Sequence, residues 1–145
     1  MNNIINLYFQ SMEIFKIWES TPRDFGSGDL LYKSEVHTLS AIGHSPGINL
    51  TSLSLKMNVS KSAMSKFVSK LLDKGLISKT IEDYNKKEVS FNLTDKGQIV
   101  FEGHEEFRKS TFSGLDDLLA NLKDEEKIFL SNFLNDLNCI LKNSL

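Results

Sequence analysis

The sequence is poor in the residues that cross-link or interrupt a chain. It holds one cysteine, Cys139, which excludes an internal disulfide and favours a reducing compartment. Its two prolines, Pro22 and Pro46, lie near glycines and predict loops at those points. No apolar run reaches the length of about 18 residues that a membrane-spanning helix needs, and the amino end does not resemble a signal peptide. We therefore expect a cytoplasmic protein with no membrane partner.

Patterns that would indicate catalysis are also missing. The sequence contains no Gly-rich phosphate loop, no nucleophile elbow and no paired-carboxylate motif. Its three histidines, His37, His44 and His104, are scattered, and Cys139 has no base beside it in the sequence. A lone cysteine of this kind is usually a packing residue, and a redox switch at Cys139 is the weaker alternative. We expect that the protein is not an enzyme and requires no cofactor.

Charge is unevenly distributed along the chain. The segment Leu50–Gly97 holds nine lysines and five acidic residues, a net charge of +4. The rest of the chain holds eight basic and fourteen acidic residues, a net charge of −6, and the two parts sum to the −2 of the whole. A basic segment on an acidic body is typical of a protein that binds DNA at one surface.

The stretch that follows Ser60 predicts an amphipathic helix. Ser60 is a good N-cap because its hydroxyl can accept a hydrogen bond from a free amide of the first turn, and Gly75 can end the helix. The apolar positions fall on one side at helical spacing: Ala63, Met64, Phe67, Val68, Leu71 and Leu72. The other side is short and mostly cationic or small and polar: Lys61, Ser62, Ser65, Lys66, Ser69, Lys70 and Asp73. Such a side suits close approach to phosphates and base edges, although an ordinary solvated face would have the same composition.

The segments on either side complete a winged helix-turn-helix. Before the helix, a short apolar stripe ends at Asn58, a residue that tolerates tight turns: Leu50, Leu53 and Met57. After it, Leu76–Ile81 predicts one strand, and the alternation from Val89 to Leu93 predicts another. The polar loop between the strands carries Lys86 and Lys87. Two helices joined by a turn and followed by a basic wing can place one helix in a DNA major groove.

Four further helices are expected outside this module. They cover Asn3 to about Ser20, Ser34 to about Ile42, Asp95 to about Phe112 and Asp124 to about Lys142. Ser34 and Thr94 are the expected N-caps, and Gly43 is expected to end the second of the helices. The apolar stripes of the first and last helices are wider than one small module can cover. We therefore expect a partner chain, with a monomer that covers its own core as the alternative.

Two stretches of the winged module have a recognisable pattern. They read VSKSAMSKFVSKLLDKGLI and NKKEVSFNLTDKG. The first resembles the recognition helix, with the glycine after it, of the MarR family of bacterial transcription regulators, and the second resembles the wing of that family. In the wing, Asn85 and Lys87 stand where the family usually has Asp and Arg, and a lysine keeps the charge but not the planar fork of arginine. The resemblance extends from about Ile4 to Leu141.

The resemblance implies a mainly α (α+β) fold, a six-helix winged helix-turn-helix with a two-stranded β wing in an intertwined homodimer. Residues 1–145 would form one domain, with 48–97 as the DNA-binding module and 1–45 and 98–145 as the dimerisation region. The protein would be a DNA-binding transcription regulator, a ligand-responsive repressor that binds a pseudo-palindromic operator in double-stranded DNA. The alternative from another class is a winged-helix module that binds a protein and no DNA.

The residues expected to bind DNA lie on the predicted recognition helix and on the wing. They are Ser60, Lys61, Ser62, Ser65, Lys66, Ser69, Lys70, Lys86 and Lys87. Lysine can donate hydrogen bonds to guanine edges, and serine can bond to either type of base. A protein-binding module would instead present apolar residues on the open face of this helix.

The resemblance also implies a small effector. Five residues could line a cleft for an organic inducer, although a plain aromatic core would explain them as well: Phe15, Trp18, Phe25, Tyr32 and His37. The zinc-sensing members of the family suggest a metal site at Glu19, His37 and His104, and three such ligands with a water would satisfy tetrahedral zinc. The fourth position holds Arg108, which cannot ligate a metal. A salt bridge between Glu19 and Arg108, with no metal, is therefore the favoured alternative.

Overall fold

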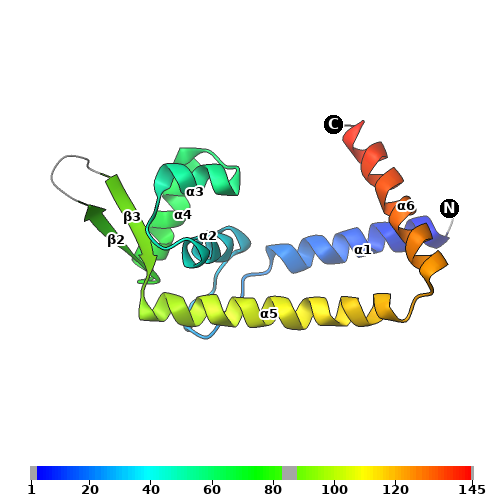
Figure 1. Ribbon diagram of the computed structural model, residues 1–145, viewed down its shortest axis with the longest axis horizontal. Coiled ribbons are helices and arrows are strands. Elements are labelled where there is room, and N and C mark those ends of the chain that lie inside the picture. Colours follow the sequence, from blue (N-terminus) through cyan, green and yellow to red (C-terminus); the bar gives the residue numbers. More distant parts are fainter. Residues whose placement is uncertain (1–2, 83–87, 145) are drawn as a thin grey trace. The chain divides into compact units, whose positions relative to one another are not determined.

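The computed structural model describes residues 3–82 and 88–144, and the chain divides into two compact units, residues 1–105 and 106–145. Within the described ranges, six helices and three strands follow one another along the chain (Figure 1). They are α1 (Asn3–Ser20), α2 (Lys33–His44), β1 (Ile48–Asn49), α3 (Leu50–Met57), α4 (Lys61–Asp73), β2 (Ile77–Glu82), β3 (Glu88–Leu93), α5 (Asp95–Ala120) and α6 (Asp124–Lys142). No helix of the described residues is long and apolar enough to cross a lipid bilayer. The predicted helix-turn-helix and the two predicted strands are confirmed.

The sheet has one strand more than the two-stranded wing that the sequence predicts. Its order is β1-β3-β2, with both pairs antiparallel. In the wing, Ile77 is opposite Leu93 and Ile81 is opposite Val89. The extra strand, β1, places Ile48 opposite Phe91. A strand of two residues is too short to show the alternation by which strands are recognised in a sequence, so it was missed.

The core of the first unit lies among α2, α3, α4, the sheet and the start of α5. Its fully buried apolar side chains are Leu31, Leu39, Ile42, Leu53, Met64, Leu71, Leu76 and Val100. From α2, the side chains of Val36, Leu39 and Ile42 are all buried in this core, at the helical spacing of one face. Each such side chain contributes about 1.5–3 kcal/mol relative to an exposed one, so burial of the apolar side of α4 holds this helix on the module.

Helix α2 begins and ends outside the limits expected from the sequence. It starts at Lys33, one residue before the expected N-cap Ser34, and continues through Gly43 to His44. The backbone N–H of Tyr32 donates to Glu35 Oε2 at 2.9 Å. The side chain of Glu35, in the first turn, thus accepts a hydrogen bond from the N–H of the residue that precedes the helix. Gly43 therefore does not end the helix. Its role is in packing, because a Cβ at this position would lie 2.5 Å from the ring of Phe101.

Helix α5 is longer than expected. It reaches Ala120, beyond the predicted end near Phe112. Its start agrees with the prediction, since Thr94 Oγ1 accepts a hydrogen bond from the backbone N–H of Gly97 at 3.1 Å. Among its apolar residues, Val100 is buried, but Ile99 is 51% exposed.

The two end helices expose the apolar stripes that the sequence predicts. On α1 the exposed large apolar side chains include Ile4, Leu7, Ile14, Phe15 and Ile17. On α6 they are Ile128, Phe129, Phe133, Leu134, Ile140 and Leu141. Helix α6 begins with three acidic residues in its first turn, as the helix dipole favours, and Glu126 Oε2 accepts from the backbone N–H of Lys123 at 2.7 Å.

Candidate nucleic-acid interface

The turn between α3 and α4 fixes where the second helix begins. Asn58 adopts the left-handed conformation, with φ 53° and ψ 47°, and its N–H donates to the carbonyl oxygen of Leu55 at 3.1 Å. Asparagine takes this conformation at a lower cost than most residues. Ser60 then caps α4, because its Oγ accepts a hydrogen bond from the N–H of Ala63 at 3.2 Å. Both local predictions from the sequence are confirmed.

Helix α4 has one buried side and one open side. Met64, Val68 and Leu71 are buried in the core of the module. All seven residues of this stretch that were expected to bind DNA are exposed: Ser60, Lys61, Ser62, Ser65, Lys66, Ser69 and Lys70. The open side therefore carries small hydroxyls and flexible ammonium groups, which permits the helix backbone to approach a groove closely.

The wing lies on the same module, beside α3 and α4 (Figure 1). Lys86 and Lys87 fall outside the described residues, so their part in DNA binding stays a prediction. On the described part of the wing, Lys79 and Thr80 of β2 are exposed. The sequence reasoning did not assign Lys79, although a lysine on the expected strand that leads into the basic loop was a usable signal.

Two lysines of the basic segment, Lys74 and Lys96, form ion pairs with acidic residues of the same unit. Lys74 Nζ lies 2.8 Å from Glu35 Oε1, and Lys96 Nζ lies 2.8 Å from Asp29 Oδ2. The hydrogen bond from Lys96 holds the pKa of Asp29 below its usual value, against the opposing effect of burial. Sequence reasoning missed these pairs. The available signal was Glu35 itself, the one acidic residue of α2, which lies in the first turn of that helix.

The five residues expected to line an organic-ligand cleft fall into separate contacts. Phe15 and Trp18 stack on α1 with ring centroids 5.7 Å apart. Phe25 meets the buried His104 edge to face at 5.3 Å, and the rings of His37 and His104 are 5.8 Å apart. The remaining residue, Tyr32, is 54% exposed. These contacts favour no single cleft, and the ligand site stays a prediction.

The three expected metal ligands are only partly brought together. His37 and His104 lie side by side, but the carboxylate of Glu19 forms an ion pair with Lys33 of α2. Arg108 belongs to the second unit, so its expected pairing with Glu19 stays a prediction. Among the residues that the structure describes, no group of three or more His, Cys, Asp or Glu side chains is placed to hold a metal ion.

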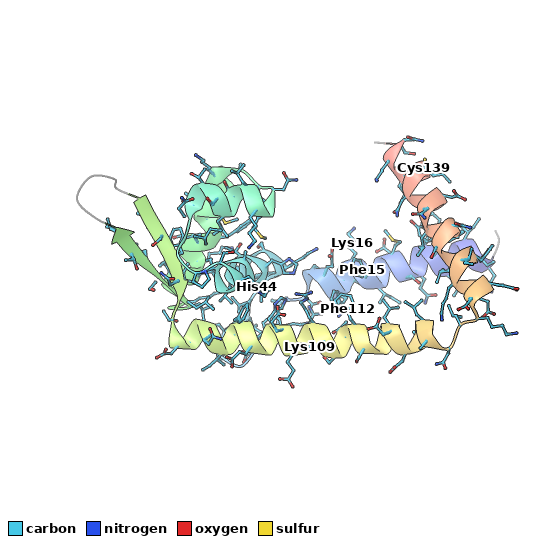
Figure 2. All side chains as sticks on the ribbon, viewed as in Figure 1. Phe15, Lys16, His44, Lys109, Phe112 and Cys139 are labelled. Atoms are coloured by element: carbon cyan, nitrogen blue, oxygen red, sulfur yellow. The ribbon has the colours of Figure 1, made fainter. Side chains whose placement is uncertain are left out.

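Two further residues considered in the sequence analysis are the third histidine, His44, and the cysteine, Cys139. His44, at the end of α2, has its Nε2 3.6 Å from Glu105 Oε1, and its ring meets Phe101 at 5.0 Å. Cys139 is exposed on α6, so it is not the packing residue that was expected within one chain (Figure 2).

Comparisons with known proteins agree with this geometry. Residues 31–89 match the model of the MarR family. The HTH-type transcriptional regulator YhjH of Bacillus subtilis is 29% identical over 147 residues, which cover 93% of this chain and 84% of YhjH. The HTH-type transcriptional regulator PchR of the same organism is 32% identical over 109 residues, 75% of this chain and 64% of PchR.

A solved structure has the same fold over nearly the whole chain. Lactococcus lactis ZitR in complex with DNA superimposes with a TM-score of 0.78 at 21% identity, and the match covers 97% of this chain and 99% of ZitR. ZitR is described as a zinc-responsive MarR family member. The family match over residues 31–89, the regulators of similar sequence and the shared fold together support a winged-helix transcription regulator of the MarR family.

Proposed function

We propose that this regulator acts as a repressor that binds a pseudo-palindromic operator as a homodimer, with α4 as the recognition helix. The observation that carries the proposal is the open side of α4, on which all seven predicted DNA-binding residues are exposed while the apolar side is buried. Residues 48–97 would form the DNA-binding module, and 1–45 with 98–145 the dimerisation region. Its place of action would be the cytoplasm, where bacterial operators lie.

Readout by this helix would combine few direct base contacts with many electrostatic ones. Lysines such as Lys66 can donate to guanine O6 and N7, and serines such as Ser65 can bond to a base directly or through water. Lys61, Lys70 and the wing lysines would bind phosphates. Because these contacts release counterions, operator affinity should fall steeply with added salt.

The homodimer is supported by the exposed apolar side chains of α1 and α6. Phe129 is 72% exposed and Ile128 is 62% exposed, which is unfavourable in water unless another surface covers them. A two-fold dimer presents two recognition helices, and their half-site centres should lie about 34–36 Å apart or a multiple of that distance.

The rival function, a winged-helix module that binds a protein, lacks support on α4. The apolar residues of that helix are buried or half-buried, and its open positions are serines, lysines and one aspartate. A protein-binding helix face usually offers aromatic or aliphatic anchors to its partner. Binding of double-stranded DNA is therefore the better use of this surface.

An organic effector fits the chain better than zinc does. Two of the three candidate ligands, His37 and His104, lie together, but Lys33 occupies the third, Glu19. A tetrahedral zinc site needs four ligands, of which at least three come from the protein and the fourth can be a water. We therefore propose that the aromatic groups around His104, namely Phe25 and His37, contact an organic inducer. Zinc is kept as the second candidate because ZitR is described as zinc-responsive.

Selection from random double-stranded DNA, followed by footprinting, tests the proposal. We expect an enriched site with two inverted half-sites and protection of both on the same face of the duplex. An enriched site without two-fold symmetry would contradict binding as a homodimer. The absence of any enriched sequence, with the protein folded, would contradict operator binding itself.

A further inference from the structure

The carboxyl end of α4 is fastened to the rest of its unit by two lysines. Lys74, the C-cap of α4, donates from Nζ to Glu35 Oε1 at 2.8 Å and to the carbonyl oxygen of Leu30 at 2.9 Å. Lys96, in the first turn of α5, donates to the carbonyl oxygen of Lys74 at 3.1 Å and pairs with Asp29 at 2.8 Å. Three segments that are distant in the sequence therefore meet where α4 ends.

The buried member of this network is Glu35. Its side chain is 2% exposed, and Oε2 accepts a hydrogen bond from the N–H of Tyr32 at 2.9 Å. A buried carboxylate without a counter-charge is strongly unfavourable, so Glu35 requires the ammonium group of Lys74 close by. The pair thus fixes the separation between the first turn of α2 and the end of α4.

The turn after α4 is held by a second set of contacts. Thr94 Oγ1 donates to the carbonyl oxygen of Gly75 at 2.7 Å, and the N–H of Thr94 donates to the carbonyl oxygen of Leu76 at 3.1 Å. With Lys96 on the carbonyl of Lys74, three successive carbonyl groups after the helix are bound from the start of α5. The turn that follows α4 is thereby bound to the start of α5, which restrains the carboxyl end of the helix.

We infer that Lys74 and Glu35 are positioning residues for DNA recognition: they hold α4 at the angle its base contacts require and do not touch DNA themselves. The inference rests on the proposed binding of DNA through α4. Lys74 is at the opposite end of the helix from Ser60, whereas recognition helices read bases with their amino-terminal part. Its charge is already paired with Glu35. Base contacts need sub-ångström placement, while phosphate contacts tolerate small displacements, so loosening this end should reduce specificity first.

The test measures affinity for the selected operator and for random DNA at several salt concentrations. We expect Lys74→Met and Glu35→Gln each to lose on the order of tenfold in the operator-to-random affinity ratio. The dependence of affinity on salt should remain that of the wild type, because no phosphate contact is lost. In contrast, Lys61→Ala, which removes a proposed phosphate contact, should lower the salt slope by about one. Lys109→Met, which removes an exposed lysine of α5 outside the module, should change neither quantity.

Two results would overturn the inference. A salt slope lowered by about one in Lys74→Met would make Lys74 a phosphate contact, and an unchanged affinity ratio would deny it a positioning role. If Lys74→Met does not fold because Glu35 is left unpaired, the double variant Lys74→Met/Glu35→Gln removes both charges and replaces it in the test. A lowered salt slope or an unchanged affinity ratio in the double variant would overturn the inference in the same way. Failure of the proposed function would be distinct, since the wild type would then show no preference for any sequence.

Discussion

Gly97 lies directly against the backbone of Leu76, so that a methyl group at position 97 would overlap the Leu76 carbonyl oxygen. The same oxygen accepts a hydrogen bond from the N–H of Thr94, and Thr94 Oγ1 in turn accepts from the N–H of Gly97. The first turn of α5 is therefore packed on the turn that follows the recognition helix. Only a residue without a side chain permits this approach.

Gly97→Ala should destabilise the protein by about 1–3 kcal/mol, because the added carbon forces α5 or the turn at Leu76 to move. Gly114→Ala is the matched control on the same helix, since a Cβ there meets no atom within 4 Å. That control should be neutral or stabilising by up to about 1 kcal/mol, as alanine favours the helix. Unfolding in urea measures both, and equal midpoints for the two variants would show that the close approach is not maintained in solution.

The two groups of lysines should differ in what they contribute to DNA binding. Lys66→Ala should weaken the operator by about 1–3 kcal/mol and relax specificity, because an α4 lysine can reach base edges. Lys86→Ala should weaken all sequences more evenly, since a wing lysine would bind the backbone. Fluorescence anisotropy on operator and random duplexes separates these effects. If the double variant binds the operator as the wild type does, DNA is bound elsewhere on the protein.

The parts of the fold that were predictable from the sequence are those with a local cause. Ser60 as a cap, Asn58 as a left-handed turn and the alternation from Val89 to Leu93 each depend on neighbouring residues, and all agree with the structure. The apolar side of α4 follows from its 3.6-residue period, which also set apart the seven residues that prove to be exposed.

The parts that were missed depend on contacts between distant residues. The strand β1 exists because Ile48 pairs with Phe91, and the early start of α2 depends on the Glu35 side chain. The pair formed by Glu35 and Lys74 joins positions 39 residues apart, a relationship that no local pattern reveals. For the same reason, a lysine-rich stretch alone did not distinguish solvent-facing lysines from those, such as Lys74, that hold the fold together.

A dimer should form through the exposed apolar residues of the end helices. Phe129→Glu places a charge on the most exposed large apolar position of α6 and should shift the protein toward monomer, with weaker operator binding. Ser131→Glu, at an exposed polar position of the same helix, is the matched control and should remain dimeric. Sedimentation equilibrium measures both. A wild-type monomer at micromolar concentration that still binds its operator tightly would contradict the proposed assembly.

Zinc should bind weakly or not at all, because Lys33 competes for Glu19 and leaves His37 and His104 as the two remaining candidate ligands. After dialysis against a chelator, zinc uptake can be followed by calorimetry and operator binding by anisotropy in the same samples. Lys33→Met releases Glu19 and should raise zinc affinity if these three residues can form a site at all. His37→Ala and His104→Ala are the controls, since each removes one imidazole from the candidate set. Tight uptake by the wild type that both alanine variants abolish would establish a metal site and displace the organic effector proposed here. Uptake that neither variant changes would place any zinc away from these residues.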